Sequence, residues 1–189
     1  MEVAAQSNLT THIGVVSSSS SSSSCDEEFN KLVHRWTLWA HLPHNIDWSM
    51  KSYIQVATVG TVEETIAVTE TLPAILVENC MLFWMKEGIK PTWEDPRNRN
   101  GGCFSYKVLN KSVHKVWKDL TYVVAGNTLS KQAAYVNCVN GITISPKKNF
   151  CIIKIWMSDC SNQNPEAVTS DLVGLSSHGC LFKQHNPEF

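Results

Sequence analysis

The sequence lacks any apolar run close to the roughly 20 residues that cross a bilayer. It also lacks, near its first residues, the basic stretch and apolar core of a secretory signal. Both absences argue against membrane insertion and export. We therefore expect a soluble protein of the cytoplasm, with the nucleus as a second location, and no membrane partner.

Paired cysteine motifs are missing as well, because the seven cysteines are scattered, odd in number and never spaced as Cys-x-x-Cys. This pattern indicates neither a disulfide framework nor a zinc site, and we expect buried or idle thiols. His41 and His44 could share a metal ion, but no second pair completes four ligands. We expect both histidines at the surface, and neither a metal nor a cofactor.

Catalytic motifs are absent too. The sequence has no Gly-rich loop ending in Lys-Ser/Thr and no dinucleotide-binding fingerprint. Cys103 and His114 have no evident third residue that would orient a thiol–imidazole pair. The sequence therefore predicts a binding protein rather than an enzyme.

Charge of neither sign dominates, but the charges are unevenly distributed. All 16 basic residues and 13 of the 17 acidic ones lie within residues 31–189, which gives this part a net charge of +3. A mildly basic body suits a small anionic ligand better than a long duplex. A solvated surface without any partner is the alternative.

Eight consecutive serines, Ser17 to Ser24, lie in a polar segment that ends in acidic residues. Such a segment cannot bury enough apolar surface to offset its ordering entropy, so we expect residues 1–29 to be a disordered tail. Residues 30–189 are long enough for one domain with a substantial core.

Apolar patterning in this domain predicts short strands over residues 35–42, 51–60, 80–87, 102–109, 133–145 and 150–159. "PKKN" between the last two is typical of a hairpin. A capping box at Thr61 and Glu64 opens a helix to about Leu72, helical spacing predicts another over 112–125, and a third short helix is expected near Pro165. This order favours an α+β fold, with an antiparallel sheet covered by helices on one face.

Six of the seven tryptophans fall into two groups. Those in periodic apolar segments, expected in the core, are Trp36, Trp39, Trp84 and Trp117. Trp48 and Trp93 lie instead in the polar, turn-forming stretches "HNIDWSMK" and "KPTWEDP". Two indoles on loops could form a slot for a flat aromatic ligand, since stacking contributes about 1–3 kcal/mol per base.

Glu94 directly follows Trp93, and one carboxylate can accept both N1–H and N2–H₂ of a guanine. Adenine does not offer these two adjacent donors. The alternative is a Trp93 packed over its own loop beside two solvated acids, and composition alone favours this alternative.

Basic candidates for binding phosphate are Lys147 and Lys148 in the predicted hairpin and Lys154 in the strand after it. Alternation places Lys154 and Trp156 on one face of this strand, with apolar residues on the other. This pattern is compatible with two structures: the face could be the floor of a ligand pocket, or it could be a solvated face on which Trp156 is half buried.

Four segments together resemble the eukaryotic messenger-RNA cap-binding factor, initiation factor 4E. These are "HRWTLWAHLPHNIDW", "GIKPTWEDPRNRNGGCF", "VHKVWKDL" and "IIKIWMSDCSNQNPEAV". The resemblance covers about residues 31–170 and implies a curved antiparallel sheet, shaped like a cupped hand, with helices on its convex back.

The ligand that the resemblance implies is the 7-methylguanosine cap, stacked between Trp48 and Trp93. It also implies that Glu94 reads the guanine edge and that Trp156 lies beside the N7 methyl group. Methylation makes the base cationic, which strengthens stacking on indole faces.

The phosphate side departs from the family. Lys147 matches a phosphate-binding arginine, but Ile152 occupies the position of a phosphate-binding lysine, and Cys103 replaces a basic residue after the Gly-Gly pair. Lys154 and Lys148 are our candidates to compensate.

The convex back departs further. The helix that receives a scaffold factor or a repressor peptide in the family keeps Val62 but has Ile66 in place of a tryptophan, and Asp119 replaces a glutamate. Loss of an aromatic anchor should weaken this interface. A competitor that binds caps without recruiting the scaffold is therefore an alternative function. We expect a monomer whose C-terminal part, after "PEAV", is shortened.

Overall fold

The computed structural model describes residues 29–168 and 172–185. Apart from Phe29, the serine-rich tail expected over residues 1–29 lies outside this part of the chain. No helix within it is long and apolar enough to cross a membrane.

Seven antiparallel strands form one sheet in the order β2-β1-β3-β5-β6-β4-β7. The strands are β1 (Lys31–His41), β2 (Tyr53–Thr61), β3 (Met81–Lys86), β4 (Gly102–Leu109), β5 (Val139–Pro146), β6 (Phe150–Met157) and β7 (Leu181–Gln184). The helices are α2 (Val62–Thr71), α3 (Ala74–Asn79), α4 (Asn110–Ala125) and α5 (Ala133–Asn137), with the 3-10 turns η1 (Met50–Ser52) and η2 (Pro165–Ala167). The predicted α+β class is confirmed.

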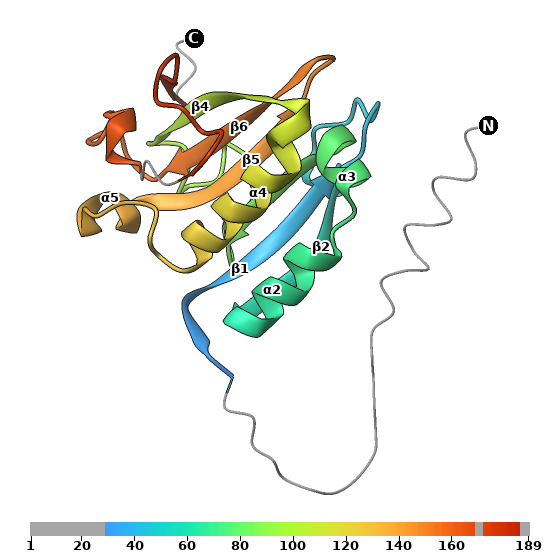
Figure 1. The fold of residues 1–189 in the computed structure, drawn as a ribbon, viewed down its shortest axis with the longest axis horizontal. Coiled ribbons are helices and arrows are strands. Elements are labelled where there is room, and N and C mark those ends of the chain that lie inside the picture. Colours follow the sequence, from blue (N-terminus) through green and yellow to red (C-terminus); the bar gives the residue numbers. More distant parts are fainter. Residues whose placement is uncertain (1–28, 169–171, 186–189) are drawn as a thin grey trace, which may run out of the picture.

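Helices α2, α3 and α4 lie against the same face of the sheet (Figure 1). The main core fills this interface, and it contains the buried side chains of Trp36, Trp84 and Trp117, as predicted. In β3, Phe83 and Met85 alternate with the core residues of the strand and point to the opposite face of the sheet. We call this second face, which bears Phe83, Met85 and Trp156, the open face.

The two long helices follow their sequence signals closely. Thr61 caps α2 by accepting a hydrogen bond from the Glu64 amide, and the Glu64 carboxylate bonds back to the Thr61 amide. Helix α4 begins two residues earlier than predicted and buries the periodic stripe of Val113, Val116 and Trp117.

Other predictions were wrong or incomplete. Residues 133–137 form helix α5 instead of the start of a strand, and the buried Tyr135 ring packs there against Phe104 of β4 in the main core. Only a three-residue 3-10 turn follows Asn164. Helix α3 and strand β7 were not predicted, since both are too short to show a periodic pattern.

Trp39 also differs from its prediction. It is only partly buried, and it packs on the open face against the Phe83–Trp156 cluster rather than in the main core. Strand alternation explains this difference. Trp36 points toward the helices, and Trp39 lies three residues further along β1, so its side chain points to the opposite face.

Candidate functional site

The floor of the open face is a small apolar cluster of Phe83, Met85, Ile89 and Trp156. Trp156 is fixed in this floor, since its Nε1 donates to Thr143 Oγ1 at 2.7 Å and only 7% of the residue is exposed. The predicted alternation along β6 is confirmed: Lys154 shares this face with Trp156, whereas Ile153 enters the main core.

Trp48 lies on the loop between β1 and β2 and is 56% exposed. Its indole stacks on the His41 ring, with 4.2 Å between centroids and 3° between planes. The His41 Nε2 contacts the Asp47 carbonyl oxygen at 2.9 Å, which ties the loop to the end of β1.

The prediction of a surface His41 was therefore wrong, because the residue is only 2% exposed. Its ring lies between Trp48 and Tyr53, which contacts it edge-on at 5.2 Å. His41 is a site residue that the sequence did not reveal; its only signal is its place at the end of an apolar strand.

Trp93 and Glu94 lie on the long loop between β3 and β4, and both are exposed. Trp93 has 39% of its surface exposed. Burial, followed by the negative charge of Glu94, raises the pKa of Tyr53. The Glu94 carboxylate therefore lies within electrostatic range of the ring that supports His41 and, through it, Trp48.

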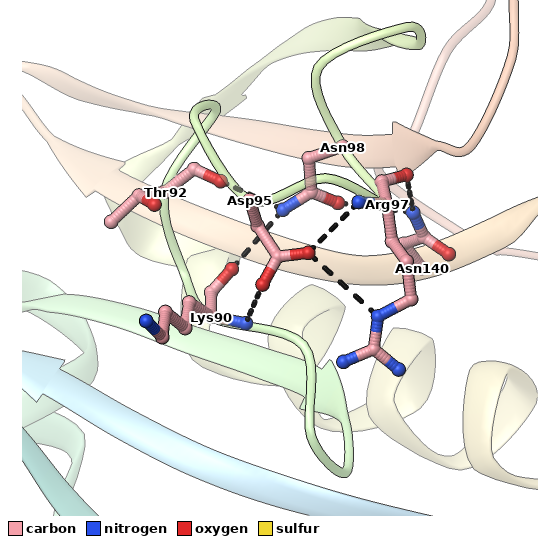
Figure 2. A network of polar contacts seen from close by, with 6 residues as sticks. All are labelled: Lys90, Thr92, Asp95, Arg97, Asn98 and Asn140. Carbon is pink, nitrogen blue, oxygen red and sulfur yellow. Dashed lines mark hydrogen bonds and ion pairs between the residues drawn. The ribbon is translucent and has the colours of Figure 1, made fainter.

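Asp95 holds this loop in shape (Figure 2). Its carboxylate is buried and accepts the backbone amides of Lys90 and Arg97, both at 2.9 Å. The Arg97 guanidinium lies 3.7 Å from the same carboxylate. One acid thus joins the two sides of the turn that carries Trp93 and Glu94.

Asn98 completes the network (Figure 2). It is fully buried, and its Nδ2 donates to the carbonyl oxygens of Lys90 (3.1 Å) and Thr92 (2.8 Å). Its Oδ1 accepts from Asn140 Nδ2 at 3.0 Å, which fastens the loop to β5. Neither Asp95 nor Asn98 had a predicted role, because their partners are mostly backbone atoms.

Glycine is required where this loop enters β4. A Cβ atom at Gly101 would overlap the carbonyl oxygen of Met157. The expected turn at "NGG" is thus present, and it brings the loop close to the end of β6.

His185 is a second residue that the sequence did not reveal. It follows β7, contacts the Trp156 ring edge-on at 4.6 Å, and its Nδ1 lies 3.0 Å from the Asn98 carbonyl oxygen. Burial, with a smaller effect from the Lys154 charge, lowers the pKa of His185. The ring is therefore neutral near pH 7 and joins the loop to the floor.

The predicted basic residues are divided between two places. Lys154 lies on the open face two residues from Trp156, which corresponds to about 7 Å along a strand. Lys147 and Lys148 are exposed in the turn between β5 and β6. That turn lies roughly 13 Å beyond Lys154 along β6.

On the helix side, Val62 and Ile66 line a groove of about 350 Å³ between α2 and α4. The groove also includes Tyr122, whose hydroxyl donates to Glu70 at 2.7 Å. Burial, then this hydrogen bond, raises the pKa of Tyr122 to about 12. Asp119 lies one turn earlier on α4, outside the groove lining, and pairs with Lys115 at 2.5 Å.

Among the described residues, no group of three or more His, Cys, Asp or Glu side chains could hold a metal ion. The six cysteines in this part of the chain are free thiols.

A family model described as "Eukaryotic initiation factor 4E" matches residues 31–186. Eukaryotic translation initiation factor 4E-2 of Schizosaccharomyces pombe is 30% identical over 142 residues, which cover 70% of this chain and 56% of that protein. The factor 4E homolog of Acanthamoeba polyphaga mimivirus is 27% identical, over 71% of this chain and 54% of its own length. The chain thus spans about half the length of these two relatives.

Two solved structures share the fold. Schistosome eIF4E, complexed with m7GpppG and 4E-BP, gives a TM-score of 0.64 at 24% identity, over 72% of this chain and 76% of that one. Ascaris suum eIF4E-3, in complex with m7G cap, gives 0.62 at 23% identity, over 71% and 76%. These similarities confirm the curved antiparallel sheet with helices.

The network around Asn98 yields a prediction about stability. Asn98→Ala removes three buried hydrogen bonds and leaves the Lys90 carbonyl oxygen without its donor, so it should lower the free energy of unfolding by about 2–3 kcal/mol. Urea denaturation measures this loss. Asn100→Ala, an exposed change in the same loop, is the control and should stay within about 0.5 kcal/mol of the parent protein. Equal stabilities of both variants would contradict this role of Asn98.

Proposed function

Because the chain belongs to the eukaryotic initiation factor 4E family, we propose that it binds the 7-methylguanosine cap of messenger RNA and acts in translation initiation. The observation that carries this proposal is the pair of exposed indoles, Trp48 and Trp93, on two loops beside the open face. Glu94 adjoins the second indole on a loop that Asp95 and Asn98 hold in shape.

In this proposal the base stacks between Trp48 and Trp93. Each stacked face contributes about 1–3 kcal/mol, and the positive charge of the methylated ring adds a cation–π attraction. The His41 ring already covers one face of Trp48, which supports a single open indole face for the ligand. Restricting the indole before binding reduces the entropy lost in the complex.

Glu94 reads the base by accepting the guanine N1–H and N2–H₂ donors, and the cationic ring strengthens these bonds. Trp156 lies beside the N7 methyl group, at the floor of the site. Among the predicted cations, Lys154 is the nearest to Trp156 and is the first candidate to meet the phosphates, whereas Lys147 and Lys148 lie further along the direction of β6. These assignments involve binding only and no catalytic step.

The groove on the helix side supports a partner site for a scaffold initiation factor or a repressor peptide. Its apolar lining includes Val62 and the 46% exposed Ile66. An isoleucine buries less area than an aromatic anchor, so the partner should bind weakly. The same observation favours the second candidate function, a competitor that occupies caps without recruiting the scaffold factor.

Stacking can be tested by tryptophan fluorescence. Adding 7-methyl-GTP to the full chain should quench emission, because the base would contact Trp48 and Trp93, and Trp48→Phe and Trp93→Phe should each remove part of this signal. Trp117→Phe, in the main core, is the control whose ligand-induced change should match that of the parent protein. Absence of quenching at millimolar ligand would contradict cap binding.

The reading of guanine depends on Glu94. Glu94→Ala should weaken 7-methyl-GTP binding by about 2 kcal/mol, or roughly thirtyfold, and abolish the preference for guanine over adenine nucleotides. The measurement is a titration with both nucleotides. Glu87→Ala removes an exposed acid of the same segment that pairs with Arg35, and it should leave the preference intact. A Glu94→Ala protein that still prefers guanine would rule out this role.

The partner groove can be tested by restoring an aromatic anchor. Ile66→Trp should bind a peptide from a 4E-binding protein about tenfold more tightly than the parent chain, because a buried tryptophan supplies a large share of such interfaces. Ile75→Trp, at a 64% exposed position on α3 outside the groove lining, is the matched control. Micromolar or tighter binding by the parent chain would contradict the competitor function.

A further inference from the structure

Three lysines from three neighbouring strands share the open face with Trp156. In the strand register, Lys154 is opposite Ser105, Lys107 is opposite Ile152, and Lys183 is opposite Cys103. Cys103 is itself opposite Trp156. Directly paired residues of antiparallel strands point to the same face, so all three lysines share the face of Trp156.

Ser105 lies at the centre of this group. It is directly opposite Lys154, two residues from Lys107 on the same strand, and diagonal to Lys183 across β7. Direct and diagonal neighbours of this kind have their Cβ atoms about 5–8 Å apart. The serine is partly exposed, so a hydroxyl donor is available among the three ammonium groups.

Negative charge is absent from this part of the sheet. Strands β4, β5, β6 and β7 contain no Asp or Glu. Lys107 and Lys183 are exposed, and the Lys107 Nζ lies 4.6 Å from the centre of the Phe150 ring. The positive charge of Lys154 also reaches His185 on Trp156. These four strands next to the candidate base site therefore carry lysines and no carboxylates, a charge pattern that favours an anion.

We propose that Ser105, Lys107, Lys154 and Lys183 form a binding site for the phosphate chain of a nucleotide whose base lies against Trp156. This inference rests on the proposed function and states the path of the phosphates. They cross from β6 to β4 and β7 instead of following β6 to the hairpin at Lys147 and Lys148.

This arrangement also accounts for the two positions that lack a basic residue. Ile152 and Cys103 carry no charge, but the residue directly opposite each of them is a lysine, Lys107 and Lys183 respectively. Side chains on adjacent strands start about 5 Å apart, which is less than the length of a lysine side chain. The ammonium groups can thus occupy the same region from the neighbouring strand.

The test compares ligands with and without phosphates. Wild-type chain, Lys107→Gln/Lys183→Gln and the matched hairpin control Lys147→Gln/Lys148→Gln are titrated with 7-methylguanosine and with 7-methyl-GTP at two salt concentrations. The first double variant should bind 7-methyl-GTP at least about tenfold more weakly, with a smaller salt dependence, and 7-methylguanosine unchanged within about twofold. The hairpin control should change less for either ligand.

Melting temperatures equal to that of the wild type would show that the exposed lysine variants are folded. A loss confined to the hairpin control, or equal wild-type affinities for the two ligands, would overturn the phosphate site while leaving cap binding intact. If the wild type binds neither ligand, the base site is wrong, and calorimetry with inorganic triphosphate then tests the lysines alone. Triphosphate binding that Lys107→Gln/Lys183→Gln abolishes would support the anion site, and binding that is absent or unchanged would overturn it.

Discussion

The loop between β3 and β4 has its shape because two buried polar side chains satisfy its backbone. Fifteen or so residues without regular structure must still find partners for their amides and carbonyls. Asp95 accepts two amides and Asn98 donates to two carbonyls. Asn140 on β5 donates to Asn98 Oδ1 and to the Arg97 carbonyl oxygen, which ties the loop to the sheet. Trp93 and Glu94 lie between the residues that these hydrogen bonds join, so the loop holds both side chains in a fixed, exposed position.

The two indole walls are held by different means. Trp93 depends on hydrogen bonds within its own loop, whereas Trp48 depends on stacking against His41, a buried ring at the end of β1. Tyr53 links these two parts, since it contacts His41 and also experiences the Glu94 charge. The sheet is thus a rigid base, and loops anchored to it carry the groups that face a ligand.

Much of the fold could be predicted from local patterns. The period of two along β6 placed Trp156 and Lys154 on one face, and the capping box at Thr61 placed the start of α2. Residues 133–137 were predicted as a strand because apolar content alone does not separate a short helix from a strand. The packing of Tyr135 against Phe104 decides that segment, and β4 lies about thirty residues earlier in the chain.

The candidate site, like the fold, has features that local patterns predict and features that depend on distant contacts. Local patterns in the chain suffice to say which residues share the face of a strand or helix, because alternation and helical spacing follow from backbone geometry. Packing of distant segments, in contrast, sets the stacking of His41 on Trp48 and the contacts of His185 with Asn98 and Trp156. It also sets Lys107 and Lys183 opposite Ile152 and Cys103. These pairs depend on strand order and register, which arise from burying one face of the whole sheet. No single residue of the sequence indicates which residue lies opposite it.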